Sequence, residues 1–201
     1  MKISIINSGS GNIASLKNML SFLGYNPVVC DQVEDLNKSD FIFLPGVGSF
    51  DNAIKNLKQK NFYDYLKEKK NFDNSILIGI CVGMQLLFES SEEGTEKGLN
   101  LLSGKIKKFS VKSIKVPHMG WNSVFGDNFY KNCNGKRYYF AHSYYAVCDD
   151  SDIIVAKSEY GKKFPVYVKK NNIQGIQFHP EKSHKNGMEL LNNILYSDYT
   201  W

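Results

Sequence analysis

The sequence is poor in arginine and has no cluster of basic residues. Arg137 is the only arginine, and the net charge of +5 comes from lysines scattered along the 201 residues. Proteins that bind nucleic acid gather arginine and lysine on one face, with aromatic side chains between them. The sequence shows no such stripe, so we expect no nucleic-acid partner.

Long apolar runs are also missing. No stretch approaches the roughly 18 apolar residues that a membrane span needs. The opening residues, MKISIINSGSGN, lack the pattern of a signal peptide. We therefore expect no membrane partner and a cytoplasmic location.

The cysteines show no spacing that is typical of a disulfide framework or a metal site. Cys30, Cys81, Cys133 and Cys148 form no CxxC pair. Disulfides are rare in the cytosol, and metal sites built on cysteine use close pairs. We expect four free thiols and no bound metal.

The length and composition fit a single globular domain spanning residues 1–201. Hydrophobic residues make up 42% and charged residues 22%, which excludes a disordered or fibrous class. In the first half, short apolar runs alternate with helical patterns, which favours a parallel sheet with helices on its faces. We expect strands at 2–7, 27–30, 41–46 and 76–81, and helices at 13–24, between 51 and 70, and at 84–90.

The second half has mostly strand-like patterns, which indicate added antiparallel strands. These patterns lie at 105–110, 122–125, 137–147, 153–159, 166–170 and 173–179. An amphipathic segment from Gly187 to Tyr196 predicts a final helix. The predicted fold class is therefore α/β, with an open, mostly parallel central sheet, flanking helices and antiparallel additions.

Ligands of such sheets bind at the loops that follow the carboxyl ends of the strands. Three of these loops contain glycine: Ser8–Asn12, Pro45–Phe50 and Gly79–Gln85. We expect them to meet at one edge of the sheet and to form the site.

Cys81 lies between Gly79 and Gly83, in the pattern of a nucleophile elbow. Flanking glycines permit a sharp turn from strand to helix, and the unpaired N–H groups at the helix start would stabilise a thiolate and an oxyanion. Free cysteine is also one of the most buried residue types. The pattern by itself leaves both interpretations open, a nucleophile and a small core residue.

A thiolate nucleophile needs a base, and the base needs an orienting group. His179 and Glu181 stand two positions apart at the end of an apolar strand, where they should point to the same side. Pro180 cannot donate to a strand ladder, so the strand should end there. Taken singly, His179 could also be a surface histidine beside a turn.

The loop Pro45–Phe50 could complete an oxyanion hole. Its glycines, Gly46 and Gly48, let backbone N–H groups turn toward a substrate carbonyl, beside the N–H of Val82. The alternative is an ordinary turn that ends a strand.

Together, these residues resemble the class I, or triad-type, glutamine amidotransferases over nearly the whole chain. The resemblance is closest to the glutaminase subunits of that family that serve histidine biosynthesis. It is carried by SGSGNIASLKN, LPGVGSF, GICVGMQLLFESSEEG, VPHMGWN, YYFAHSYY and GIQFHPEKS.

The resemblance implies that Cys81 is the nucleophile, His179 the general base and acid, and Glu181 the residue that orients His179. Many family members have leucine at the position of Val82, but only its N–H would be used. The residues implied in oxyanion and glutamine binding are Gly46, Val47, Gly48, Val82, Gln85, Ser143 and Tyr144.

The resemblance also implies that no cofactor or metal takes part, and that ammonia passes to a partner. The partner would be a (β/α)8-barrel cyclase, bound as a heterodimer, with Trp121 and Asn122 near the docking face. Exposed aromatic residues often anchor interfaces, although a tryptophan such as Trp121, taken alone, is more often a core residue.

Three other interpretations remain. Residues Gly9–Ala14 follow a strand and fit the dinucleotide motif GxGxxA, with Asp31 at the expected distance. A related amidotransferase subunit could supply ammonia to a different synthase, such as one that makes a cell-surface sugar. A catalytically silent interaction protein is disfavoured because all three triad positions are filled.

Overall fold

A seven-stranded sheet forms the centre of the molecule. The computed structural model describes residues 1–110 and 114–197, without the side chains of residues 69 and 70. The order across the sheet is β10-β11-β12-β4-β3-β1-β2. These strands are β1 (Ile3–Ile6), β2 (Val28–Cys30), β3 (Phe41–Gly46), β4 (Ile76–Cys81), β10 (Ile154–Glu159), β11 (Lys163–Lys170) and β12 (Ile173–Ile176).

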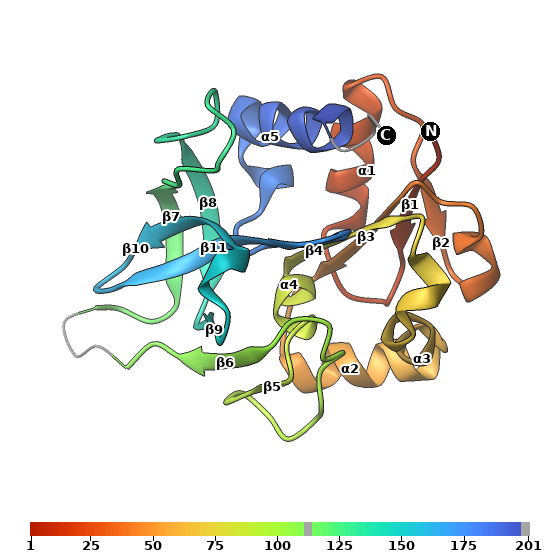
Figure 1. Ribbon diagram of the computed structural model, residues 1–201, viewed down its shortest axis with the longest axis horizontal. Coiled ribbons are helices and arrows are strands. Elements are labelled where there is room, and N and C mark those ends of the chain that lie inside the picture. The colour runs from red at the N-terminus through yellow and green to blue at the C-terminus, as the bar shows by residue number, and fades with distance from the viewer. Residues whose placement is uncertain (111–113, 198–201) are drawn as a thin grey trace.

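Strands β12, β4, β3, β1 and β2 are mutually parallel, whereas β10 and β11 are added as antiparallel strands. Helices cover both faces of the sheet (Figure 1). One face carries α1 (Ile13–Phe22) and α5 (His184–Ser197), and the other carries α2 (Phe50–Gln59), α3 (Phe62–Lys67) and α4 (Val82–Leu86). This arrangement confirms the predicted fold class.

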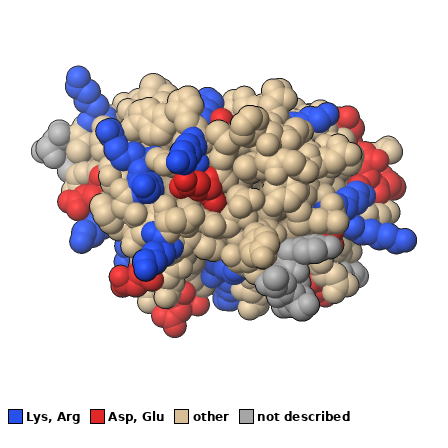
Figure 2. Space-filling view, turned by 90° about the horizontal axis from the view of Figure 1, so that it is seen from above, with Lys and Arg blue, Asp and Glu red and all other residues tan. Residues whose placement is uncertain are grey.

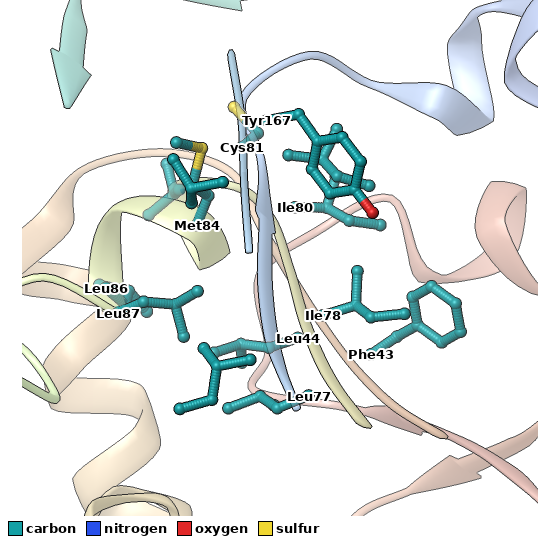
Figure 3. Close-up of a cluster of buried hydrophobic side chains, with 14 of the residues drawn as sticks. Phe43, Leu44, Leu77, Ile78, Ile80, Cys81, Met84, Leu86, Leu87 and Tyr167 are labelled. Carbon is teal, nitrogen blue, oxygen red and sulfur yellow. The ribbon is translucent and has the colours of Figure 1, made fainter. Parts of the chain in front are cut away.

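The apolar strands β3 and β4 lie in the core. Every residue of both strands is buried, as expected of parallel strands that are covered on both faces. Figure 3 shows the cluster around them, with Leu77 at one end and Cys81 at the other. The core therefore holds the carboxyl end of β4 in a fixed position.

Two small sheets stand beside the central sheet. One contains β5 (Ser90–Ser91), β6 (Gly104–Lys108) and β9 (Tyr144–Cys148), and the other contains β7 (His118–Ser123) and β8 (Arg137–His142). The strand predicted at 137–147 is confirmed over 137–142 and 144–147, but Ser143 divides it into two strands. The chain breaks at Ser143, whose carbonyl oxygen accepts a hydrogen bond from the N–H of Phe109, and it passes there from one small sheet to the other.

Several predicted bounds also differ. The helix expected at 84–90 runs instead from Val82 to Leu86. It ends there because the backbone groups of Glu89 form hydrogen bonds with Gly98 and Gly104 rather than within the helix. The strand expected at 122–125 overlaps only the last two residues of β7, which ends at Ser123. The described residues also form short 3-10 helices: η1 (Val33–Leu36), η2 (Lys69–Phe72), η3 (Ser151–Ile153) and η4 (Pro180–Lys182).

The surface over α1 and α5 carries lysines toward both ends, beside acidic residues, and little charge in the middle (Figure 2). The described residues therefore form no continuous basic tract on this face. Within 1–110 and 114–197, no helix has the length and apolar character needed to cross a membrane. All four cysteines are free thiols, as predicted.

Candidate active site

Cys81 lies at the sharp turn between β4 and α4. Its φ is 55° and its ψ is −110°, a conformation that residues other than glycine rarely adopt. The following residue, Val82, begins α4. This is the strand-to-helix turn that the elbow pattern predicts.

The flanking glycines are required by close packing. A Cβ atom on Gly79 would lie 2.5 Å from the carbonyl oxygen of Gly83, and a Cβ atom on Gly83 would overlap the carbonyl oxygen of Leu44. Gly46 also packs here, since its Cβ atom would lie 2.8 Å from the nitrogen of Gly83. The three glycines let α4 approach β3 and β4 closely enough to form the turn.

His179 reaches the same edge of the sheet by a different route from the one predicted. Strand β12 ends at Ile176, not at Pro180, and the N–H of His179 instead donates to the carbonyl oxygen of Tyr139 at 2.8 Å. The short helix η4 then turns Glu181 back toward the imidazole. The turn, rather than strand alternation, brings the two side chains together.

His179 and Glu181 form a buried pair. Nδ1 of His179 lies 2.8 Å from Oε1 of Glu181, and each side chain is 3% exposed. Burial disfavours the charged imidazole, but the neighbouring Cys81 sulfur and the Glu181 carboxylate outweigh it and raise the pKa of His179 to about 10. Burial also opposes the charge on Glu181, yet the bond from His179 holds the pKa of this carboxyl below its ordinary value.

Asn12 is a member of this group that the sequence reasoning missed. Its Nδ2 donates to Oε1 of Glu181 at 2.8 Å. The glycine-containing loop Ser8–Asn12 was expected at this edge, but nothing in the pattern assigned Asn12 a partner. Asp31, which a dinucleotide site would need, lies 3.4 Å from the Lys60 ammonium.

A cavity of about 400 Å³ opens over Cys81. It brings together most of the predicted site residues: Val47, Gly48, Cys81, Val82, Gln85, Ser143, Tyr144 and His179. Gly46 and Glu181 do not line it, although Glu181 contacts the lining residue His179. The wall also contains residues that were not predicted: Asn12, Glu93, Pro117, Met119, Ala141, His142 and Lys182.

Gln85 is held on the cavity wall by two acceptors. Its Nε2 donates to the carbonyl oxygen of Tyr144 at 3.1 Å and to Oε1 of Gln177 at 3.2 Å. Nε2 of Gln177 lies 3.9 Å from the Cys81 sulfur. Gln177 is completely buried, and the sequence reasoning overlooked it because it lies within an apolar run.

A cysteine, a buried histidine–carboxylate pair and a glycine loop meet around one cavity on a mostly parallel sheet, which is the set of groups that a cysteine-dependent hydrolase needs. The family model for glutamine amidotransferase class-I matches residues 4–197, and the chain belongs to that family. It is therefore an enzyme that releases ammonia from glutamine.

Named relatives are similar over nearly their whole length. The imidazole glycerol phosphate synthase subunit HisH 2 of Methanococcus maripaludis is 44% identical over 201 residues, covering 96% of this chain and 98% of its own. The subunit HisH of Carboxydothermus hydrogenoformans is 42% identical, covering 94% and 96%. A solved structure of PurLQS from Thermotoga maritima shares the fold, with a TM-score of 0.76, 17% identity and 98% of each chain covered.

Proposed function

We propose that this chain, as one domain over residues 1–201, is the glutaminase subunit of imidazole glycerol phosphate synthase in histidine biosynthesis. It hydrolyses glutamine and passes the ammonia to a (β/α)8-barrel cyclase, with which it forms a heterodimer. The proposal is supported by the relatives of that name, which are 44% and 42% identical over nearly the full chain.

In the first chemical step, the Cys81 thiolate attacks the side-chain amide carbon of glutamine. The amide oxygen becomes an oxyanion, which the N–H groups of Val47, Gly48 and Val82 stabilise. The C–N bond then breaks, and the imidazolium of His179 gives its proton to the departing nitrogen. Ammonia leaves, and a glutamyl thioester remains on Cys81.

In the second step, water attacks the thioester carbon and gives a proton to the now neutral His179. The C–S bond breaks, glutamate is released, and the thiolate and imidazolium are restored. Glu181 moves no proton. It fixes the ring of His179 through the 2.8 Å contact and favours its charged form.

Glutamine binding is assigned to three further residues of the cavity lining. Gln85 contacts the substrate, and the backbone around Ser143 and Tyr144 holds its amino-acid end. All three residues line the cavity that contains Cys81. The reaction uses neither a cofactor nor a metal.

The docking face for the cyclase includes Trp121 and Asn122 on β7. Trp121 is 38% exposed, and the neighbouring Met119 is 65% exposed and lines the cavity. Exposed apolar side chains beside the mouth of a reaction cavity suit a partner that receives the product directly.

The observation that carries the proposal is the grouping of Cys81, His179 and Glu181 beside the loop Pro45–Phe50. The test is to purify the chain with the cyclase of the same organism and to measure synthesis with glutamine or with ammonium salt. We expect Cys81→Ala to abolish glutamine-dependent synthesis and to preserve ammonium-dependent synthesis. Glutamine-dependent synthesis by Cys81→Ala, or a wild-type chain that does not bind the cyclase, would contradict the proposal.

A further inference from the structure

Two buried histidines outside the proposed mechanism face each other across β7 and β8. His118 comes from the PHMGWN stretch, and His142 is the last residue of β8. The residues are direct partners in the strand register, and Nδ1 of His118 lies 2.9 Å from Nε2 of His142. They are 4% and 6% exposed. A direct contact between two imidazoles must have one donor and one acceptor.

Both ends of this pair have a fixed partner. Nδ1 of His142 lies 2.7 Å from the carbonyl oxygen of Tyr144. Nε2 of His118 lies 3.3 Å from Nδ2 of Asn122. The same Asn122 nitrogen donates to the carbonyl oxygen of Glu159 at 2.8 Å, and Oδ1 of Asn122 accepts from the N–H of Ser123. The Asn122 amide is therefore held in one orientation.

These contacts define one direction for every hydrogen bond. A carbonyl oxygen only accepts, so His142 must carry its proton on Nδ1 and accept at Nε2. His118 must then donate from Nδ1 and accept at Nε2, where the Asn122 amide nitrogen supplies the donor. The proton positions inferred from the Tyr144 carbonyl at one end and from the Asn122 amide at the other are therefore the same. A proton added to either ring would place two donors face to face.

The environment keeps both rings neutral. Burial lowers the pKa of His118 to about 4 and that of His142 to about 3. The rings of Phe140 and Tyr160 stack on His118, with centroid distances of 4.7 Å and 4.1 Å. The pair therefore stays in the protonation state that the chain of hydrogen bonds requires.

The chain of hydrogen bonds ends at the proposed glutamine site. The carbonyl oxygen of Tyr144 accepts from both His142 and Gln85, and two donors fill its two lone pairs. The second Nε2 hydrogen of Gln85 goes to Gln177. The amide nitrogen of Gln85 is thus fully committed, and its amide oxygen is the atom left to accept a bond from a substrate N–H.

We propose that His118 is a positioning residue for glutamine binding. Through His142 it fixes the carbonyl of Tyr144, and through that carbonyl it orients the Gln85 amide and the 143–144 segment. This inference rests on the proposed glutaminase function and adds a determinant of glutamine affinity that touches neither substrate nor nucleophile.

The test uses the complex with the cyclase and compares His118→Leu with His118→Asn. Leucine removes the donor to His142, whereas the Asn amide nitrogen keeps a donor near the position of Nδ1. We expect His118→Leu to raise the KM for glutamine about tenfold or more, with kcat within about threefold. We expect His118→Asn to restore KM to within about threefold of wild type.

Two further measurements separate positioning from general damage. Synthesis from ammonium salt should not change in either His118 variant, because it bypasses the glutamine site. Alkylation of Cys81 by iodoacetamide should proceed at the wild-type rate, while alkylation by a glutamine-like chloroketone should slow in His118→Leu. Equal slowing with both reagents would overturn the inference.

A second pair of variants decides the matter if His118→Leu does not fold. Asn122→Leu removes the donor to His118. Asn122 and Asn128 both line a surface cavity of about 570 Å³, so Asn128→Leu serves as the control. We expect only Asn122→Leu to raise the KM for glutamine, by several-fold, with cyclase binding measured separately.

An unchanged KM in both His118→Leu and Asn122→Leu would overturn the positioning role. A wild-type complex that does not hydrolyse glutamine would instead overturn the proposed function, so the two failures can be distinguished.

Discussion

The side chain of Asn12 donates to the same carboxylate oxygen of Glu181 that contacts Nδ1 of His179. Both contacts measure 2.8 Å. The loop after β1 therefore restrains the carboxylate together with the imidazole. Oε2 of Glu181 is buried and has no hydrogen-bond partner among the described residues, so the position of this carboxylate depends on Oε1.

Replacing Asn12 with leucine should lower the kcat for glutamine hydrolysis by about tenfold. The variant loses one hydrogen bond to a charged, buried group, which typically contributes about 1.5–3 kcal/mol. Steady-state kinetics of the complex measure the effect. Ser10→Ala, in the same loop but without a contact to Glu181, is the control and should keep the wild-type rate. Equal activity of Asn12→Leu and wild type would show that Glu181 needs no restraint from this loop.

His179 should remain protonated at pH 8 in the free protein. Its folded-state pKa of about 10 depends on the neighbouring Cys81 sulfur and on Glu181. NMR titration of the imidazole measures this value directly. Cys81→Ala should lower the pKa of His179, because the Cys81 sulfur no longer counteracts the effect of burial. A His179 that titrates near 6.5 in the wild-type protein would contradict the paired arrangement.

The same pKa predicts how stability depends on pH. The native state binds the His179 proton more tightly than the unfolded chain does, with a pKa of about 10 against an ordinary value of 6.5. The stabilisation is complete below pH 6.5 and is lost as the pH rises toward 10. Denaturant unfolding of wild type and His179→Gln should therefore show a difference in the free energy of unfolding that shrinks with rising pH over this range.

A glutamine-like chloroketone should alkylate Cys81 rapidly and the other cysteines slowly. Cys81, although largely buried, lines the cavity, whereas the buried Cys30 and Cys133 do not line it. Burial raises the pKa of the Cys30 and Cys133 thiols and raises that of Cys148 to about 12, which leaves little reactive thiolate. Mass spectrometry of the labelled peptides reports the sites. Equal labelling of any other cysteine would contradict the assignment of Cys81 as the nucleophile.

Glu181→Gln should reduce turnover less than His179→Ala does. Glutamine can still accept the bond from His179 and keep the ring in place, although it no longer favours the charged imidazole. Alanine at position 179 removes the group that transfers the proton. Single-turnover rates of the two variants provide the comparison, and the reverse order would contradict the assigned roles.

Gly48→Pro should suppress glutamine-dependent synthesis and leave ammonium-dependent synthesis intact. Gly48 has a φ of 90°, which proline cannot adopt, and proline would also remove an N–H from the oxyanion loop. The loss of one such donor typically costs about 100- to 1000-fold in rate. Gly24→Pro is a matched control for backbone strain, since Gly24 has a φ of 89° outside the cavity.

The same loop should make the isolated chain a poor glutaminase. If one oxyanion donor turns away until a loaded cyclase docks, free subunit and complex should differ in glutaminase rate by about 100- to 1000-fold. Equal rates in the two states would refute this gating, although the assignment of Cys81 would survive.

Local sequence patterns predict the architecture that the structure shows and place Cys81 at a turn from strand to helix. The apolar runs of β3 and β4 identify buried parallel strands because only strands covered on both faces lack polar positions. The glycines around Cys81 identify a tight turn because they allow packing that a Cβ atom would prevent. Both features produce short local patterns, an apolar run and a glycine spacing, so the sequence alone predicts them.

The tertiary structure decided which distant groups meet. Residues 137–147 form one strand-like pattern in the sequence, and only pairing with Phe109 and with β7 shows that the strand breaks at Ser143. Likewise, the bond between Asn12 and Glu181 spans 169 positions. The side chains of His118 and His142 gain their fixed hydrogen-bond directions from carbonyl groups at Glu159 and Tyr144. Periodicity records which face of an element is buried, whereas the partner of a buried polar atom depends on how the elements pack, and that is settled only when the whole chain folds.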